Sequence, residues 1–148
     1  MPKHFLIIEA RFYPEISDEL MRGATAELER RGATFERRAV PGVLEIPAAL
    51  AMAIRAEKDG RRYDGYVLLG CVIRGETTHY DIVANESARA IMDFAVANAL
   101  AVGNGILTVE NSAQAWARAR VGEKNKGAVA AAAAFEMAAL RAELGLTK

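Results

Sequence analysis

The sequence has few of the features that mark secreted, membrane or nucleic-acid-binding proteins. One cysteine, Cys71, stands among its 148 residues, so an internal disulfide is excluded and a reducing cytoplasm is the expected compartment. Lys plus Arg and Asp plus Glu number 19 each, which leaves no net basic charge to attract nucleic acid or an anionic membrane. The apolar run after the first four residues is too short for a signal peptide, and no segment approaches a membrane span. We therefore expect a cytoplasmic protein with no nucleic-acid or membrane partner.

Repeats and linkers are also lacking, and the length fits one domain over residues 1–148. Apolar runs alternate with segments of helical periodicity. Strands are expected at residues 5–8, 34–40, 65–73 and 104–109. Helices are expected at residues 18–31, 46–58, 80–100, 113–119 and 127–144. Pro14 is expected to keep residues 11–17 out of a helix, Gly32 to end the first helix, and residues 59–60 to form a turn.

This order predicts an α/β fold, a flavodoxin-like three-layer α/β/α sandwich around a central four-stranded parallel sheet. The strand at 34–40 is rich in charge, so we expect it near an edge of the sheet. Ligands of open parallel sheets bind outside the carboxyl ends of the strands. That rule selects the loops at residues 10–16, 40–46, 71–79 and 110–114.

The loop at 74–78 is the most informative of the four. Gly75 permits close backbone approach to a ligand, and the first amides of the next helix have no partner within it. With the hydroxyls of Thr77 and Thr78, these amides suit a phosphate; the simpler interpretation is that one threonine caps the helix. His79 follows directly, and is either a proton-transfer group or a solvent-facing residue of the first turn.

Other loop residues also have two interpretations. Phe12 and Tyr13 are able to stack on a planar ring, although Tyr13 is better explained as a plug at the edge of the core. Backbone groups at 42–44 and the Glu45 carboxylate suit a polar ligand, or else form a turn and a helix cap. Cys71 is expected to be a buried small hydrophobe and not a nucleophile, because no histidine lies near it in the sequence.

Late in the chain lies a basic run made of Arg118, Arg120, Lys124 and Lys126. Such runs are usually a solvated face, whereas the planar fork of arginine also suits a phosphate. Arg74 is expected to be an ordinary charged loop residue.

Together these loops resemble those of the lumazine synthase family, the 6,7-dimethyl-8-ribityllumazine synthases. The matching segments occur in family order at residues 10–12, 40–47, 69–81, 105–111 and 125–127. The third, Leu-Gly-Cys-Val-Ile-Arg-Gly-Glu-Thr-Thr-His-Tyr-Asp, is the most specific. The resemblance implies a transferase of riboflavin biosynthesis. It would condense 5-amino-6-(D-ribitylamino)uracil with 3,4-dihydroxy-2-butanone 4-phosphate, without a cofactor or a metal.

The resemblance also assigns roles to individual residues. His79 would be the proton donor and acceptor. The pyrimidine and its ribityl chain would contact Phe12, Val43, Leu44, Glu45, Cys71, Val72, Ile73 and Asn104. The phosphate would contact Glu76, Thr77, Thr78 and Arg118, and Lys126 would lie near the site. Two positions depart from the family pattern, since Cys71 is often threonine there and Asn104 is often aromatic.

Small-molecule substrates and other copies of the chain are the partners that the resemblance implies. Asn104, Arg118 and Lys126 would reach the active site from a neighbouring subunit of a homo-oligomer. The minimum assembly is a homopentamer, and some members build a sixty-subunit shell. The short N-terminus and the atypical segment 120–124 favour an isolated pentamer. Riboflavin synthase is a further candidate partner.

Three kinds of non-catalytic protein are alternatives to an enzyme. A receiver-like module needs acidic residues at the ends of the first and third strands, and residues 9–11 and 70–72 match this poorly. A flavodoxin needs a hydroxyl-rich loop after its first strand, which Arg11-Phe12-Tyr13-Pro14 is not. The remaining alternative is a non-catalytic lumazine- or flavin-binding homologue, against which stands the presence of both His79 and Arg118.

Overall fold

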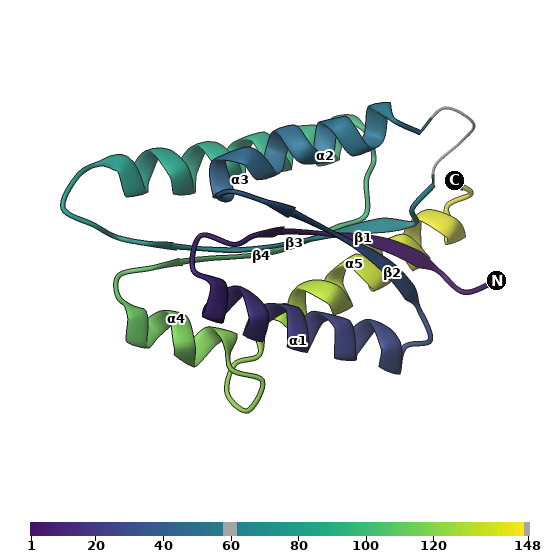
Figure 1. Cartoon of the computed structure of the whole chain (residues 1–148). Helices are drawn as coiled ribbons and strands as arrows, with labels where there is room; N and C mark the ends of the chain where they lie inside the picture. The colour runs from purple at the N-terminus through teal and green to yellow at the C-terminus, as the bar shows by residue number, and fades with distance from the viewer. Residues whose placement is uncertain (58–61, 147–148) are drawn as a thin grey trace.

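Four parallel strands form the centre of the molecule (Figure 1), in a computed structural model that describes residues 1–57 and 62–146. The strands are β1 (His4–Ala10), β2 (Thr34–Val40), β3 (Gly65–Ile73) and β4 (Val102–Val109). Their order across the sheet is β2-β1-β3-β4, and each neighbouring pair is parallel. The predicted α/β fold with a four-stranded parallel sheet is confirmed.

Burial explains the sequence of each strand. β3 is an interior strand covered on both faces, which is why its run Gly-Tyr-Val-Leu-Leu-Gly-Cys-Val-Ile is continuously apolar. β2 is an edge strand with exposed charged side chains, as expected. The predicted bounds of these two strands are those observed. β1 and β4 are longer than predicted, because both begin earlier and β1 also extends through the charged residue Glu9.

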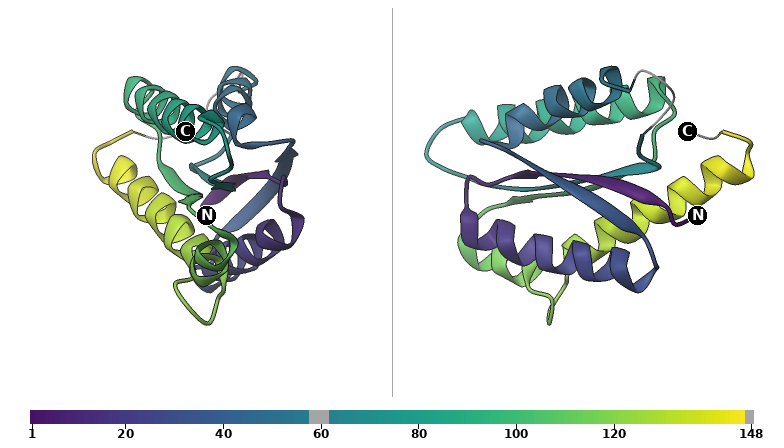
Figure 2. Two further views of the ribbon diagram at one scale, coloured as in Figure 1. Left: turned by 90° about the vertical axis from the view of Figure 1, so that its left-hand side faces the viewer. Right: turned by 45° about the vertical axis from the view of Figure 1, so that its right-hand side comes forward.

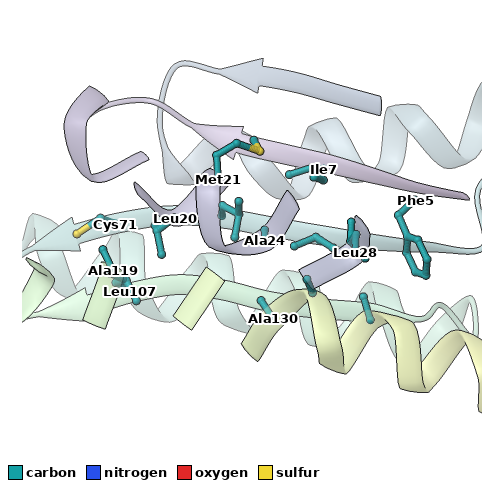
Figure 3. Packing of buried hydrophobic residues seen from close by; sticks show 14 of the residues in the cluster. Phe5, Ile7, Leu20, Met21, Ala24, Leu28, Cys71, Leu107, Ala119 and Ala130 are labelled. Atoms are coloured by element: carbon teal, nitrogen blue, oxygen red, sulfur yellow. The ribbon is translucent and has the colours of Figure 1, made fainter. Parts of the chain in front are cut away.

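Helices cover the two faces unequally (Figure 2). One layer contains α1 (Pro14–Arg30), α4 (Ser112–Ala119) and α5 (Lys126–Glu143), and the other contains α2 (Ile46–Arg55) and α3 (His79–Ala97). Leu20, Ala24 and Leu28 of α1 meet Phe5 of β1 and Ala130 of α5 in one core cluster (Figure 3). Much of the alanine excess of the sequence thus lies buried on α5, where small side chains permit close contact with β4.

The start of the first helix and the end of the second were predicted wrongly. α1 begins at Pro14, within the segment expected to be non-helical. Proline is tolerated there because the first turn of a helix has no acceptor for the missing N–H, and its fixed φ is already helical. Gly32, with φ of +75°, follows the end of α1 as expected. α2 ends at Arg55, so the predicted helix over 46–58 is too long, since Ala56 and Glu57 are described and are not helical. Lys58 and the predicted turn at 59–60 lie outside the described residues.

The remaining helices differ from prediction by small amounts at their ends. α3 ends at Ala97, before Leu100, and Ala99 there takes a positive φ of 50°. A short 3-10 helix, η1 (Val43–Glu45), precedes α2 and was not anticipated. None of the helices within the described ranges has the length and apolarity needed to cross a membrane.

Candidate active site

Three of the four expected loops meet around a cavity of 460 Å³ at the carboxyl ends of β1, β2 and β3. The loop after β1 supplies two aromatic side chains, the loop after β2 supplies η1, and the loop after β3 leads into α3. The cavity is lined by Phe12, Tyr13, Pro41, Gly42, Val43, Leu44, Glu45, Cys71, Val72, Ile73, Gly75, Thr77, His79, Tyr80 and Val83. Most of the predicted site residues therefore lie together in one chain.

The end of β3 forms one wall of this cavity. β3 pairs with β1 as far as Leu69, opposite Glu9, and from Gly70 to Ile73 it pairs with β4 alone within the described residues. The edge of β3 that faces away from β4 is therefore open at Cys71, Val72 and Ile73. Backbone N–H and C=O groups on such an open edge are available to a planar polar ligand.

Burial controls the chemistry of Cys71 in the same wall. The side chain is buried, and desolvation raises the pKa of its thiol from the ordinary 9.0 to about 11. A nucleophilic cysteine needs a lowered pKa, so the thiol stays neutral near pH 7. The expectation that Cys71 is a buried hydrophobe is confirmed.

Phe12 and Tyr13 form an aromatic corner over the end of β1. Their rings meet edge to face, with centroids 5.0 Å apart and an interplanar angle of 79°. Tyr13 packs against the core, as expected, and also lines the cavity. Phe12 is 70% exposed and does not belong to either core cluster. Its free face suits a planar ring.

η1 presents one buried and two exposed residues to the cavity. Val43 is buried, whereas Leu44 and Glu45 are exposed. The amide of Glu45 donates to the carbonyl of Gly42 over 3.1 Å, which closes the turn. The Glu45 carboxylate is left at the cavity rim, where it is able to accept hydrogen bonds from hydroxyl groups.

The loop before α3 keeps several hydrogen-bond donors free. Neither Glu76, Thr77 nor Thr78 donates its amide to another group in residues 1–57 and 62–146. Thr77 Oγ1 accepts from the amide of His79, the first residue of α3, over 3.3 Å. Thr78, the residue before the helix, makes no side-chain cap. Helix α3 thus begins with unpartnered amides beside the cavity, a geometry suited to an anion.

His79 is the first residue of α3 and lies on the cavity wall. Its side chain is exposed, and its imidazole makes no hydrogen bond with the part of the chain described. A ring held at a helix start with both nitrogens free is accessible to a ligand in the cavity. It is the one histidine among the residues that line the cavity.

Arg74, expected to be an ordinary charged loop residue, contacts both Tyr80 and Glu110. Its guanidinium lies 4.2 Å from the centroid of the Tyr80 ring, and its Nε donates to Glu110 at 3.0 and 3.1 Å. The hydrogen bond to Glu110 raises the pKa of Arg74, so this side chain stays charged. The loop beginning at Glu110 does not line the cavity, contrary to expectation; it holds Arg74 instead.

Tyr80 and Val83 were not assigned roles from the sequence, yet both line the cavity. Val83 lies four residues after His79, on the same face of the helix. That spacing is the signal from which this contact could have been inferred.

Asn104, Arg118 and Lys126 lie apart from the cavity. They line a separate groove of 300 Å³ along β4, with Thr108 and Val129. Arg118 donates to the carbonyl of Gln114, and neither Arg118 nor Lys126 forms an ion pair with a carboxylate of the described residues. Two cations without counter-ions in one groove favour an anionic ligand. Glu76 and Thr78 are exposed in the loop before α3 and do not line either hollow.

No group of three or more His, Cys, Asp or Glu side chains is arranged to hold a metal ion in the described ranges. The polar groups of the cavity and the groove are amides, hydroxyls, one imidazole, one carboxylate and two cations. This mixture of donors, cations and one acceptor suits an organic phosphate and a hydrogen-bonding ring.

Comparison with known proteins agrees with these features. Residues 2–142 match the model of the family described as 6,7-dimethyl-8-ribityllumazine synthase. The protein of that name from Agrobacterium fabrum is 59% identical over 143 residues, which cover 96% of this chain and 97% of that protein. 6,7-dimethyl-8-ribityllumazine synthase 1 of Rhizobium meliloti is 59% identical over 148 residues, covering 99% and 97%. The Bartonella bacilliformis protein is 61% identical over 143 residues, covering 96% and 92%. The chain therefore belongs to the 6,7-dimethyl-8-ribityllumazine synthase family.

Proposed function

We propose that the protein is a transferase of riboflavin biosynthesis that makes 6,7-dimethyl-8-ribityllumazine. It condenses 5-amino-6-(D-ribitylamino)uracil with 3,4-dihydroxy-2-butanone 4-phosphate. The observation that carries this proposal is the cavity at the strand ends, which joins an exposed aromatic face, an open strand edge, unpartnered helix amides and one histidine. Family membership over residues 2–142 supports the same reaction.

The pyrimidine is proposed to occupy the side of the cavity formed by the first two loops and β3. Phe12 stacks on the ring, and the open edge of β3 at Cys71, Val72 and Ile73 meets the ring's polar edge. The ribityl chain then runs along η1, where Val43 and Leu44 contact it and Glu45 accepts from its hydroxyls. The buried thiol of Cys71 is not required for any of these contacts.

The phosphate of the four-carbon ketone is proposed to lie at the start of α3. The amides of Glu76 and Thr77 have no other acceptor among the described residues and are free to donate to it, with the Thr78 hydroxyl close by. Arg118 supplies the opposite charge. This arrangement leaves the ketone carbon between the phosphate and the pyrimidine, beside His79.

Proton transfer is proposed to be the chemical task of His79. The 5-amino group attacks the ketone, and loss of water gives an imine. Removal of a carbon-bound proton then expels phosphate, and the enol so formed tautomerises. The ribityl-bearing nitrogen attacks the new carbonyl, and a second water leaves as the ring closes. Each step moves a proton near the free imidazole, and holding the two substrates in line supplies much of the acceleration.

The complete site is proposed to be composite, with one chain giving the cavity and a neighbour giving the groove. Asn104, Arg118 and Lys126 line a hollow distinct from the cavity that holds His79, which supports this division. The assembly proposed is a homopentamer, without the further association into a sixty-subunit shell. Riboflavin synthase is a proposed partner because it acts in the same biosynthesis. The proposed location is the cytoplasm, which a single buried thiol fits.

A direct assay tests the proposal. Purified protein is mixed with the two substrates, and formation of the fluorescent lumazine is followed against the spontaneous reaction. Formation well above the spontaneous rate is expected. A folded protein that gives no acceleration, but holds a coloured flavin or lumazine stoichiometrically, would replace the enzyme with the alternative of a non-catalytic carrier.

A further inference from the structure

Glu9 is a buried carboxylate that the proposed reaction does not use. It lies at the carboxyl end of β1, its side chain is only 4% exposed, and the other buried polar residues of the described ranges are two serines. Its Oε1 accepts from Arg11 Nη1 over 2.8 Å, and its Oε2 accepts from Arg37 Nη2 over 3.2 Å. Leaving a buried carboxylate without its hydrogen-bond partners has a high free-energy cost. The contacts with Glu9 therefore restrain the side chains of Arg11 and Arg37.

Arg11 is held at three points. Besides the Glu9 contact, its Nη2 donates to Asp18 of α1 over 2.8 Å, and its amide donates to the carbonyl of Val40 over 3.2 Å. The bonds to Asp18 and Glu9 raise the pKa of the guanidinium, which stays charged. Arg11 therefore joins the end of β1, the start of α1 and the end of β2 through one residue.

These three points fix the backbone on which Phe12 stands. Ser17, also buried, donates its hydroxyl to the carbonyl of Ala10, and its amide donates to the carbonyl of Tyr13 over 2.9 Å. The short connection between β1 and α1 is thus anchored on both sides of Phe12. The Phe12 side chain itself is 70% exposed and contacts one ring, that of Tyr13. Its orientation depends on the backbone, because packing alone does not hold it.

We infer that Arg11 is a positioning residue that holds Phe12 in the orientation needed to stack on the pyrimidine. The inference rests on the proposed function. Arg11 does not line the cavity, and both of its terminal nitrogens already contact carboxylates, so it acts through Phe12 and not by contact with a substrate. Its bond to Val40 also couples Phe12 to the loop that carries η1, the second wall for the same substrate.

Kinetics of Arg11→Gln test the inference, with Arg37→Gln as the matched control. Both changes remove one arginine from Glu9, but only Arg11 adjoins Phe12. Arg11→Gln should raise the KM for the pyrimidine roughly two- to tenfold, the scale of one lost aromatic stacking contact. The KM for the ketone phosphate should stay unchanged, and Arg37→Gln should alter neither. Equal effects of the two variants on the pyrimidine KM would overturn the inference.

A double variant separates a positioning role from a general loss of stability. If Arg11 acts through Phe12, then Arg11→Gln adds nothing to the pyrimidine KM once Phe12→Ala is present. Independent, multiplying effects would contradict the inference. Asp18→Asn removes only the exposed partner of Arg11, and it replaces Arg11→Gln in the test if that variant does not fold. Asp18→Asn should also raise the KM for the pyrimidine. An unchanged pyrimidine KM would count against the inference.

A structural readout makes the test independent of the reaction. The chain has five phenylalanines, so fluorophenylalanine labelling gives few fluorine NMR signals, and the Phe12 signal is identified by its loss in Phe12→Leu. This signal should shift or broaden in Arg11→Gln and stay in place in Arg37→Gln. An unmoved Phe12 signal in Arg11→Gln would overturn the positioning role. A wild-type protein that does not make lumazine would overturn the proposed function while this measurement still decides the role of Arg11.

Discussion

Adding one methyl group at Gly103 should displace α5 from the sheet. A Cβ on this residue of β4 would overlap the carbonyl oxygen of Ala130 and lie 2.7 Å from its carbonyl carbon. Carbon atoms in contact prefer separations of about 3.5–4.0 Å, so α5 would have to retreat by roughly 1 Å. Overpacking of this kind costs about 1–3 kcal/mol. For a chain of 148 residues that corresponds to a fall in Tm of roughly 3–10 °C.

The Tm of Gly103→Ala is best measured by calorimetry at fixed protein concentration, with Gly122→Ala as the control. A Cβ on Gly122 meets nothing within 4 Å, so this control should leave the Tm nearly unchanged. Because Lys126 begins α5, the displacement should also widen the groove and weaken use of the ketone phosphate. Equal Tm values for the two variants would refute the reasoning, since the backbone contact at Gly103 would then not limit the approach of α5.

Three further predictions concern the site itself. His79→Ala should slow turnover by about a hundredfold, the scale of a lost acid–base group, with an unchanged Tm because the exposed imidazole makes no hydrogen bond with the described residues; unchanged turnover would remove it from the mechanism. Arg118→Ala should raise the KM for the ketone phosphate about tenfold or more, as for a lost charge-assisted hydrogen bond. Arg120→Ala, whose arginine pairs with Glu123, should not, and an equal loss for the pyrimidine would contradict the phosphate role. Native Cys71 should resist iodoacetamide at pH 8, and rapid labelling of the folded protein would contradict its burial. The free energy of unfolding should also fall as pH rises from 9 to about 11, because the thiol ionises at a lower pH in the unfolded chain than in the folded one.

Much of the fold follows from local patterns. β3 and β2 have the predicted bounds because their burial determines their composition. β3 is covered on both faces and is continuously apolar, whereas β2 lies at the edge of the sheet and carries charged residues. The start of α1 was mispredicted because a proline permits both a helix start and a break, and only the burial of Ile16 in the core shows that the first turn is helical.

Part of the candidate site could be predicted from the positions of residues at strand ends. Phe12, Glu45 and His79 were selected by their place at strand ends, and the cavity brings them together. Local sequence patterns could not show that Arg118 lies in a separate groove along β4. That placement depends on how α4 and α5 pack against the whole sheet. The same holds for the contact between Arg11 and Asp18, which needs α1 to place Asp18 beside the end of β1.

The composite site is the central claim. Mixing two impaired variants, at a ketone-phosphate concentration well below the KM of Arg118→Ala, tests it most directly. His79→Ala subunits keep an intact groove, and Arg118→Ala subunits keep an intact cavity. If each site joins the cavity of one chain to the groove of the next around a closed ring, an equal mixture places both intact halves together at about one quarter of the sites. Co-assembly, verified by native mass spectrometry, should therefore restore about one quarter of wild-type lumazine formation. Mixed assemblies no more active than their parents would show that each chain completes its own site, and would contradict the account.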